Sequence, residues 1–297
     1  MLAKVKSCAI IGLDGAIIEV EVDIARGLPA FAIVGLPDAA VQESRERVRG
    51  AIRNSGCDFP ATRITVNLAP AHLRKEGPAY DLPIAMGILL SSGQIEADLS
   101  DTLLFGELSL DGGLRHTGGI LPMVSVGLEH GLNKVVVPEA NAREACLVDG
   151  VEVLPARDLR QLLAHLRGDE QIAPADPGPQ VDRARDAPVG LVDFADIKGQ
   201  EHAKRALELA AAGGPNLVMS GPPGSGKTLM ARSMPGILPR LDSSEALEVT
   251  KIYSVAGLLP TDTPLLTHRP FRAPHYTIST AGVVGLKLSV SMRACLR

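Results

Sequence analysis

Residues 216–228 read NLVMSGPPGSGKT, and they set the architecture expected for the second half of the chain. The first five residues favour a short strand, and a helix is expected to begin directly after the glycines. The glycines let the loop turn tightly and point backbone N–H groups at an anion. The loop is therefore predicted to bind nucleotide phosphates through eight residues: Gly221, Pro222, Pro223, Gly224, Ser225, Gly226, Lys227 and Thr228.

Two residues of this loop carry the chemistry that ATP requires. The ammonium group of Lys227 is expected to reach the β- and γ-phosphates, and the hydroxyl of Thr228 to bind the nucleotide's Mg²⁺. The alternative is a glycine-rich turn that carries a lysine by chance, but strand, loop and helix occur in the order that the motif demands. The sequence thus predicts ATP and Mg²⁺ as ligands, and it assigns no catalytic residue.

ATP hydrolysis requires acidic residues in addition to a phosphate loop. P-loop ATPases use an apolar strand that ends in Asp, and in this class a neighbouring Glu polarises water. In the 69 residues after Thr228 (297 minus 228), no carboxylate follows a run of four apolar residues. The carboxylates there are Asp242, Glu245, Glu248 and Asp262. We therefore expect weak ATP binding and negligible turnover.

Composition narrows the class of protein. The chain has 30 Lys and Arg against 34 Asp and Glu, so no overall field attracts nucleic acid or anionic membrane. No stretch approaches the roughly 18 apolar residues of a membrane span. The four cysteines form no CxxC pair and have no His at ligand spacing, which argues against zinc or a disulfide framework. These features predict a cytoplasmic protein with no membrane contact.

A domain boundary is predicted at residues 168–190, where four prolines and mixed charges replace hydrophobic periodicity. Residues 1–167 read as one mixed α/β domain, and residues 191–297 as part of an ATP-binding domain. In the first domain a hairpin with a turn at Asp14-Gly15 is expected, and 103–110 is expected to be one strand. A helix should run from the N-cap Asp38 to a stop at Gly56.

Three segments carry a family resemblance. Residues 196–217 (DIKGQEHAKRALELAAAGGPNL), the phosphate loop and 269–279 (RPFRAPHYTIS) together resemble the magnesium-chelatase-like AAA+ ATPases of the ComM/YifB type. The resemblance covers residues 1 to about 285. It implies a Lon-protease-like α/β domain followed by a partial P-loop AAA+ αβα module. In this family Ile197 and Gly199 match a segment that packs near the adenine; an ordinary turn before a helix is the alternative.

The resemblance also implies an activity. Intact members of this family are bacterial and cytoplasmic, assemble as homo-oligomeric ATP-dependent rings, and act on DNA as branch-migration motors that support natural transformation and recombination. The alternative left open is a non-catalytic Lon-like docking or assembly domain with a vestigial nucleotide site. Metal chelation into porphyrin rests on the family name alone.

This sequence departs from the family pattern in two places. Lon-type proteases place a nucleophilic Ser in a GPS sequence, whereas this chain has Gly77-Pro78-Ala79, and the activating Lys is replaced in the region of Leu121. The chain is therefore not expected to be a protease. From about Leu286 the sequence leaves the family pattern, and we expect a C-terminal truncation or frame change there, ahead of the second acidic motif.

Two further groups of residues have a structural and a functional interpretation. Arg45, Arg49 and Arg53 recur at spacing four and could face DNA phosphates or a partner subunit, but interleaved glutamates favour a solvated face. His268 and His275 stand near prolines with no carboxylate beside them, so a structural role is expected and a metal site is not.

Overall fold

The computed structural model describes residues 2–176, 192–260, 265–273 and 277. The chain divides into two units: Met1–Pro177 with Lys251–Pro264 form unit 1, and Gly178–Thr250 with Leu265–Arg297 form unit 2. The departure expected near Leu286, most of the predicted linker and His275 lie outside the described residues.

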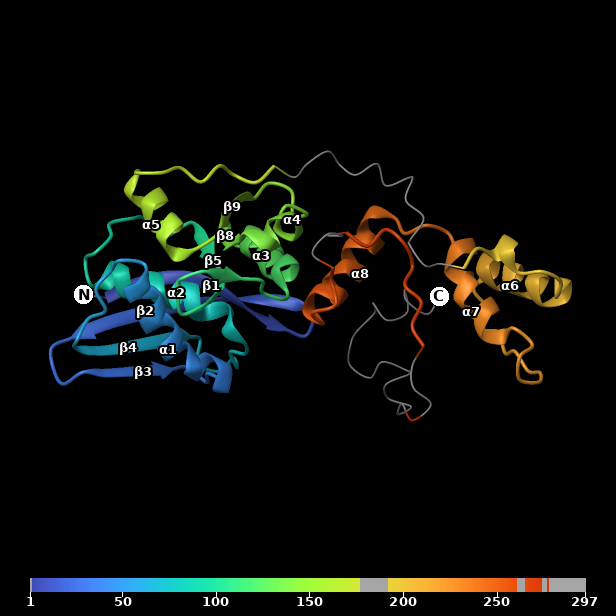
Figure 1. Cartoon of the computed structure of the whole chain (residues 1–297), viewed down its shortest axis with the longest axis horizontal. Helices are drawn as coiled ribbons and strands as arrows, with labels where there is room; N and C mark the ends of the chain where they lie inside the picture. The colour runs from blue at the N-terminus through green and yellow to red at the C-terminus, as the bar shows by residue number, and fades with distance from the viewer. Residues whose placement is uncertain (1, 177–191, 261–264, 274–276, 278–297) are drawn as a thin grey trace. The chain divides into compact units, whose positions relative to one another are not determined.

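Unit 1 is built on a seven-stranded sheet in the order β3-β4-β2-β1-β5-β8-β9 (Figure 1). Pairs β3-β4, β1-β5, β5-β8 and β8-β9 are parallel, whereas β1-β2 and β2-β4 are antiparallel. The strands are β1 (Leu2–Ile11), β2 (Asp14–Ala25), β3 (Ala30–Val34), β4 (Arg63–Ala69), β5 (Thr102–Leu104), β8 (Lys134–Pro138) and β9 (Glu152–Ala156). The α/β class expected from the sequence is confirmed.

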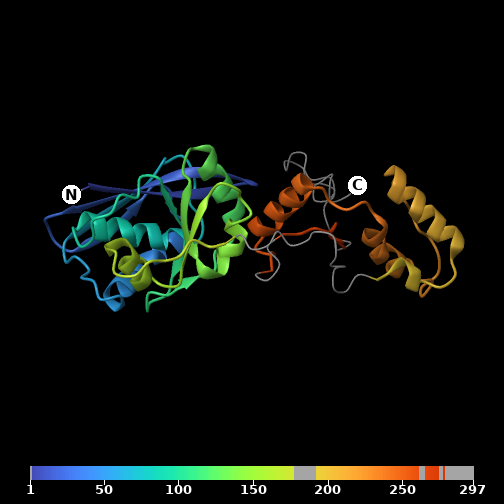
Figure 2. The ribbon, with the colours of Figure 1, turned by 90° about the horizontal axis from the view of Figure 1, so that it is seen from above.

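Helices cover both faces of this sheet, as the turned view in Figure 2 shows. Neighbouring residues of β8 point to opposite faces: Val136 belongs to the core with α1, α2 and α5, and Val135 belongs to the core with α3 and α4. The helices are α1 (Ala39–Asn54), α2 (Asp81–Ser91), α3 (Ile120–Glu129), α4 (Ala142–Ala145) and α5 (Leu159–Arg167). Unit 1 thus has a central sheet with a hydrophobic core on each side.

Helix α1 forms where the sequence predicted it. Oδ1 of Asp38 accepts a hydrogen bond of 2.8 Å from the Val41 N–H and caps the first turn. Val48 and Ile52 are fully buried on the face that meets the sheet. The helix ends before Gly56, whose φ of +83° is a conformation that glycine adopts without strain.

The first hairpin forms with a different turn from the one predicted. Ile11 pairs with Asp14, so the turn is Gly12-Leu13, and Asp14-Gly15 lies inside β2. Gly12 has φ of +67°, as a tight turn requires. A Cβ on Gly15 would meet the Cys8 Sγ at 2.8 Å, so the glycine there permits close packing instead of turning the chain.

The stretch 103–110, expected as one strand, divides into two elements. β5 ends at Leu104, and β6 (Glu107–Leu108) pairs with β7 (Leu114–Arg115) in a separate two-stranded sheet. Beyond α5, Ile172 is buried in the core and the Ala175 N–H donates to the Val153 carbonyl at 2.7 Å. Contacts of unit 1 therefore extend past the predicted boundary at residue 168.

In unit 2 the described elements are helical. They are η3 (Phe194–Asp196), α6 (Glu201–Gly213), α7 (Lys227–Ile237) and α8 (Ser243–Val255), which runs from unit 2 into the part of unit 1 that begins at Lys251. The strand predicted at 216–220 is wrong: these residues form no strand, and Val218 is 92% exposed. A strand needs a neighbour for its backbone hydrogen bonds, and the described residues of unit 2 supply none.

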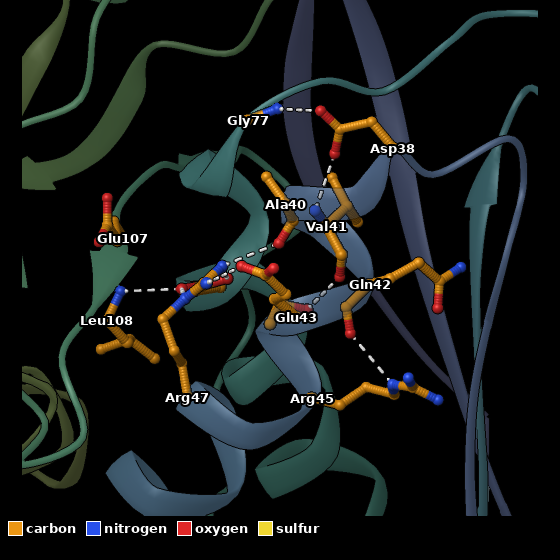
Figure 3. A network of polar contacts seen from close by, with 12 residues as sticks. Asp38, Ala40, Val41, Gln42, Glu43, Arg45, Arg47, Gly77, Glu107 and Leu108 are labelled. Carbon is orange, nitrogen blue, oxygen red and sulfur yellow. Dashed lines mark hydrogen bonds and ion pairs between the residues drawn. The ribbon is translucent and has the colours of Figure 1, made fainter.

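One buried ion pair fastens the helices of unit 1 (Figure 3). Arg47 of α1 donates from Nε to Oδ2 of Asp81 at 2.5 Å and from Nη2 to Oδ1 at 3.0 Å. The Leu108 N–H donates to the same carboxylate, and Arg47 Nη2 also reaches the Ala40 carbonyl. Asp81 is fully buried. The pair thus holds α1, the start of α2 and β6 at one point.

Removing the cation should destabilise unit 1, because Asp81 would be left buried without its partner. We expect Arg47→Ala to lower the free energy of unfolding by about 3 kcal/mol. The matched control is Arg45→Ala on the same helix, an exposed side chain, which should change it by less than about 0.5 kcal/mol. Urea denaturation followed by circular dichroism measures both. Equal losses in the two variants would contradict this role for the pair.

Burial raises the pKa of Asp81 to about 6 from its ordinary 3.8, even though Arg47 and the Leu108 N–H oppose the shift. Between these two values the folded state binds more protons than the unfolded state, so this group makes the free energy of unfolding fall as pH rises from about 4 to 6. Denaturation of wild type and Asp81→Asn at several pH values tests this. The free energy of unfolding of wild type minus that of Asp81→Asn should decrease across that window and be constant above pH 7. A value that increases with pH would refute the assignment.

Candidate nucleotide site

The phosphate loop is shaped by two glycines in left-handed backbone conformations. Gly224 has φ of +81° and Gly226 has φ of +84°, values at which a side chain is strained. Gly226 stands at the N-cap of α7, and its carbonyl accepts the Met230 N–H at 2.9 Å in the first helical turn. The loop therefore leads straight into a helix N-terminus, where backbone N–H groups favour an anion.

Lys227 turns its ammonium group back onto this loop. Nζ donates to the carbonyls of Gly221 and Pro222 at 2.9 and 2.7 Å, and to the Ser225 hydroxyl at 3.1 Å. The neighbouring Thr228 is exposed. The loop thus gathers a cation, a free hydroxyl and a helix N-terminus within one short stretch, a combination that suits a phosphate with its metal ion.

The segment expected near the adenine packs onto the helix that follows the loop. Ile197 is 6% exposed and lies in a small core with Leu207 of α6 and Met230 of α7. Gly199 is exposed, with φ of +72°, in the turn before α6. Ile197 therefore connects the start of unit 2 to α7, and contact of either residue with a base stays a prediction.

Two carboxylates that follow the loop begin helix α8. Oδ1 of Asp242 accepts the Glu245 N–H at 2.8 Å, and the Asp242 N–H donates to the Glu245 carboxylate at 3.2 Å. The bond from the Glu245 N–H lowers the pKa of Asp242, and the Ser244 hydroxyl lowers it further. Glu245 also pairs with Arg269 at 2.9 Å. Sequence reasoning missed this helix, although DSSE at 242–245 is a capping-box pattern.

Residues 77–79, where the sequence led us to expect a replaced protease nucleophile, form a partly buried turn. Gly77-Pro78-Ala79 is anchored by the Gly77 N–H, which donates to Oδ2 of Asp38 at 3.1 Å (Figure 3). Ala79 is 7% exposed, and its methyl group cannot attack a carbonyl. Leu121, in the region where the activating lysine would stand, is also buried.

A buried lysine lies two residues before this turn, and no pattern in the sequence predicted its burial. Lys75 is fully buried, its ammonium group donates to the Pro70 carbonyl, and burial lowers its pKa. Its backbone bonds to Leu36 and Asp38 tie this segment to the end of β3. The described contacts give Lys75 a structural role.

Two features are absent from the described residues. No group of three or more His, Cys, Asp or Glu side chains in that part of the chain is placed to hold a metal ion. Among the same residues, every helix is too short or too polar to cross a membrane.

Comparisons with known proteins match both halves of the chain. Residues 20–141 match a family described as subunit ChlI of Mg-chelatase, and residues 193–292 match magnesium chelatase, subunit ChlI. YifB of Escherichia coli is 42% identical over 285 residues, which cover 96% of this chain and 55% of YifB. The competence protein ComM of Haemophilus influenzae is 39% identical over 289 residues, 96% of this chain and 56% of ComM.

The chain thus spans little more than half the length of these relatives. A more distant likeness, to Lon protease 2 of Bacillus subtilis, is 25% identical over 168 residues and covers 50% of this chain and 30% of that protein. It agrees with the mixed α/β fold of unit 1.

Proposed function

Since the chain belongs to the magnesium-chelatase-like family of YifB and ComM, we propose that it binds ATP with Mg²⁺ at residues 221–228. The observation that carries this proposal is the left-handed Gly226 at the start of α7, with Lys227 turned into the loop. Lys227 offsets phosphate charge, the α7 N-terminus donates N–H groups, and the Thr228 hydroxyl binds the metal that accompanies the nucleotide.

We further propose that this stretch of chain binds ATP without turning it over efficiently. Hydrolysis needs a carboxylate free to hold the metal and another to polarise water. Asp242 and Glu245 are instead engaged in capping α8 and pairing with Arg269. Their hydrogen bonds favour a structural role over a catalytic one.

At the level of the cell we propose an ATP-dependent DNA branch-migration role in uptake and recombination, with a homo-oligomeric ring in the cytoplasm. This rests on the family and on ComM, whose name marks it as a competence protein. It is a proposal for the whole protein, because this chain covers only 56% of that relative.

Nucleotide titration tests the site. We expect Lys227→Ala to weaken binding of a fluorescent ATP analogue at least tenfold, because the cation nearest the phosphates is lost. Lys204→Ala is the matched control: this lysine pairs with Glu201 on α6 and should leave the affinity within about twofold. Equal affinity of the two variants would refute the site. Steady Mg²⁺-dependent ATP hydrolysis that Lys227→Ala abolishes would refute the proposal of poor turnover.

A second candidate function is that of a docking or assembly domain. It is favoured by the difference in extent between the hydrophobic cores of unit 1 and unit 2. Unit 1 holds two extensive cores, whereas the core cluster described in unit 2 has three buried residues, Ile197, Leu207 and Met230. If unit 1 works alone, the phosphate loop is dispensable.

A shortened chain distinguishes the two candidates. We expect residues 1–176 to unfold cooperatively, and residues 1–168 to be less stable by more than about 1 kcal/mol because the burial of Ile172 is lost. Thermal and urea unfolding measure this. Retention of all partner binding by residues 1–176 supports the docking function, and loss of it supports the ATP-dependent one. A 1–176 chain without a cooperative transition would exclude residues 1–176 as an autonomous docking domain, because the Lys251–Pro264 segment of unit 1 would then be needed for folding.

A further inference from the structure

Strand β3 (Ala30–Val34) is the outermost strand of the sheet in unit 1 and, among the described residues, is paired on one side only (Figure 1). The Ala30 N–H faces β4, since it donates to the Thr62 carbonyl. Successive residues of a strand turn their backbone groups to opposite edges, so those of Phe31 and Ile33 face the free edge. Nε2 of Gln42 lies 3.5 Å from the Ile33 carbonyl, at the limit of a hydrogen bond.

The solvent face of this strand is apolar. Its outward residues Ala30, Ala32 and Val34 are exposed, and Leu28 and Leu36, which flank the strand outside its regular alternation, are exposed as well. Leu28 is 89% exposed and Leu36 57%. No charged residue occurs from Gly27 to Pro37. Soluble proteins usually blunt a free edge with charge or an irregular strand, because unpaired backbone groups recruit another strand.

The opposite edge of the sheet is blocked. Pro155 removes a backbone donor from β9, and the Ala175 N–H occupies the Val153 carbonyl at 2.7 Å. A β3-to-β9 contact between copies would be head-to-tail and open-ended, and this blocked edge opposes it. Pairing of β3 with β3 uses one surface twice and closes after two copies.

We propose that β3 is a dimerisation strand, through which two copies of this chain pair antiparallel about a two-fold axis at Ala32. In this register Phe31 of each copy faces Ile33 of the other, and each such pair exchanges both backbone hydrogen bonds. Ala32 faces its own counterpart and Ala30 faces Val34, so small apolar side chains meet and no charges oppose each other. Gln42 releases or shares the Ile33 carbonyl. The pairing is independent of the phosphate loop.

Sedimentation of the full chain without nucleotide tests this pairing. We expect a weak dimer, with a dissociation constant of roughly 10–100 µM for so short a contact. Ala32→Lys places two lysines directly opposite each other at the axis, with their Cβ atoms about 5 Å apart, and should weaken the dimer at least tenfold. The control is Thr65→Lys, at the residue beside Ala32 on β4, which should stay within about twofold. Circular dichroism must show both variants folded.

Cross-linking tests the axis itself. Ala32→Cys, in a chain that also carries Cys146→Ser and Cys295→Ser, should form a disulfide-linked dimer much faster than Thr65→Cys in the same background. A wild-type chain that stays monomeric at several hundred micromolar would overturn the proposal, as would equal cross-linking of the two variants. Capture of a different polypeptide in cells in place of the self-dimer would assign the edge to another partner and also overturn it.

Discussion

The Arg47–Asp81 pair is the contact that holds the helical layer of unit 1 in place. A carboxylate with no exposed surface is unfavourable by itself, and here its cost is partly offset by two hydrogen bonds from one guanidinium and one from the Leu108 N–H. Because Asp81 is the first residue of α2, the pair also fixes the turn before it, which carries Ala79. Ala79, at the position where a protease would need a reactive hydroxyl, thus lies in a turn that this buried ion pair holds in place.

The sequence predicted best the features that depend on local chemistry. Asp38, Gly56 and the glycines of the phosphate loop act through neighbouring backbone, so their roles follow from types and spacing. The Arg47–Asp81 pair joins residues 34 positions apart and gave no sequence signal. The strand expected at 216–220 failed for a related reason: apolar residues favour a strand, but pairing requires a neighbour that lies elsewhere in the chain.

The two units differ in how they are stabilised. Unit 1 has an extensive hydrophobic core on each face of its sheet, and unit 2 joins α6 and α7 through few apolar side chains. A ligand that binds only the folded form would stabilise unit 2 by an amount that grows with the logarithm of its concentration over its dissociation constant. The binding proposed for the phosphate loop therefore bears on folding as well as on activity.

The contacts of Lys227 have a consequence for the phosphate binding proposed for the loop. Its ammonium group already has three oxygen partners, two carbonyls and a hydroxyl. Protein oxygens therefore stabilise the charge before any phosphate binds. Binding of a phosphate would then replace these carbonyl and hydroxyl oxygens with phosphate oxygens, as a hydrated cation exchanges water for a chelating ligand. Under the proposed binding, only the surplus of the phosphate contacts over the displaced carbonyl contacts would appear as affinity, which would favour ligands that carry more than a single negative charge.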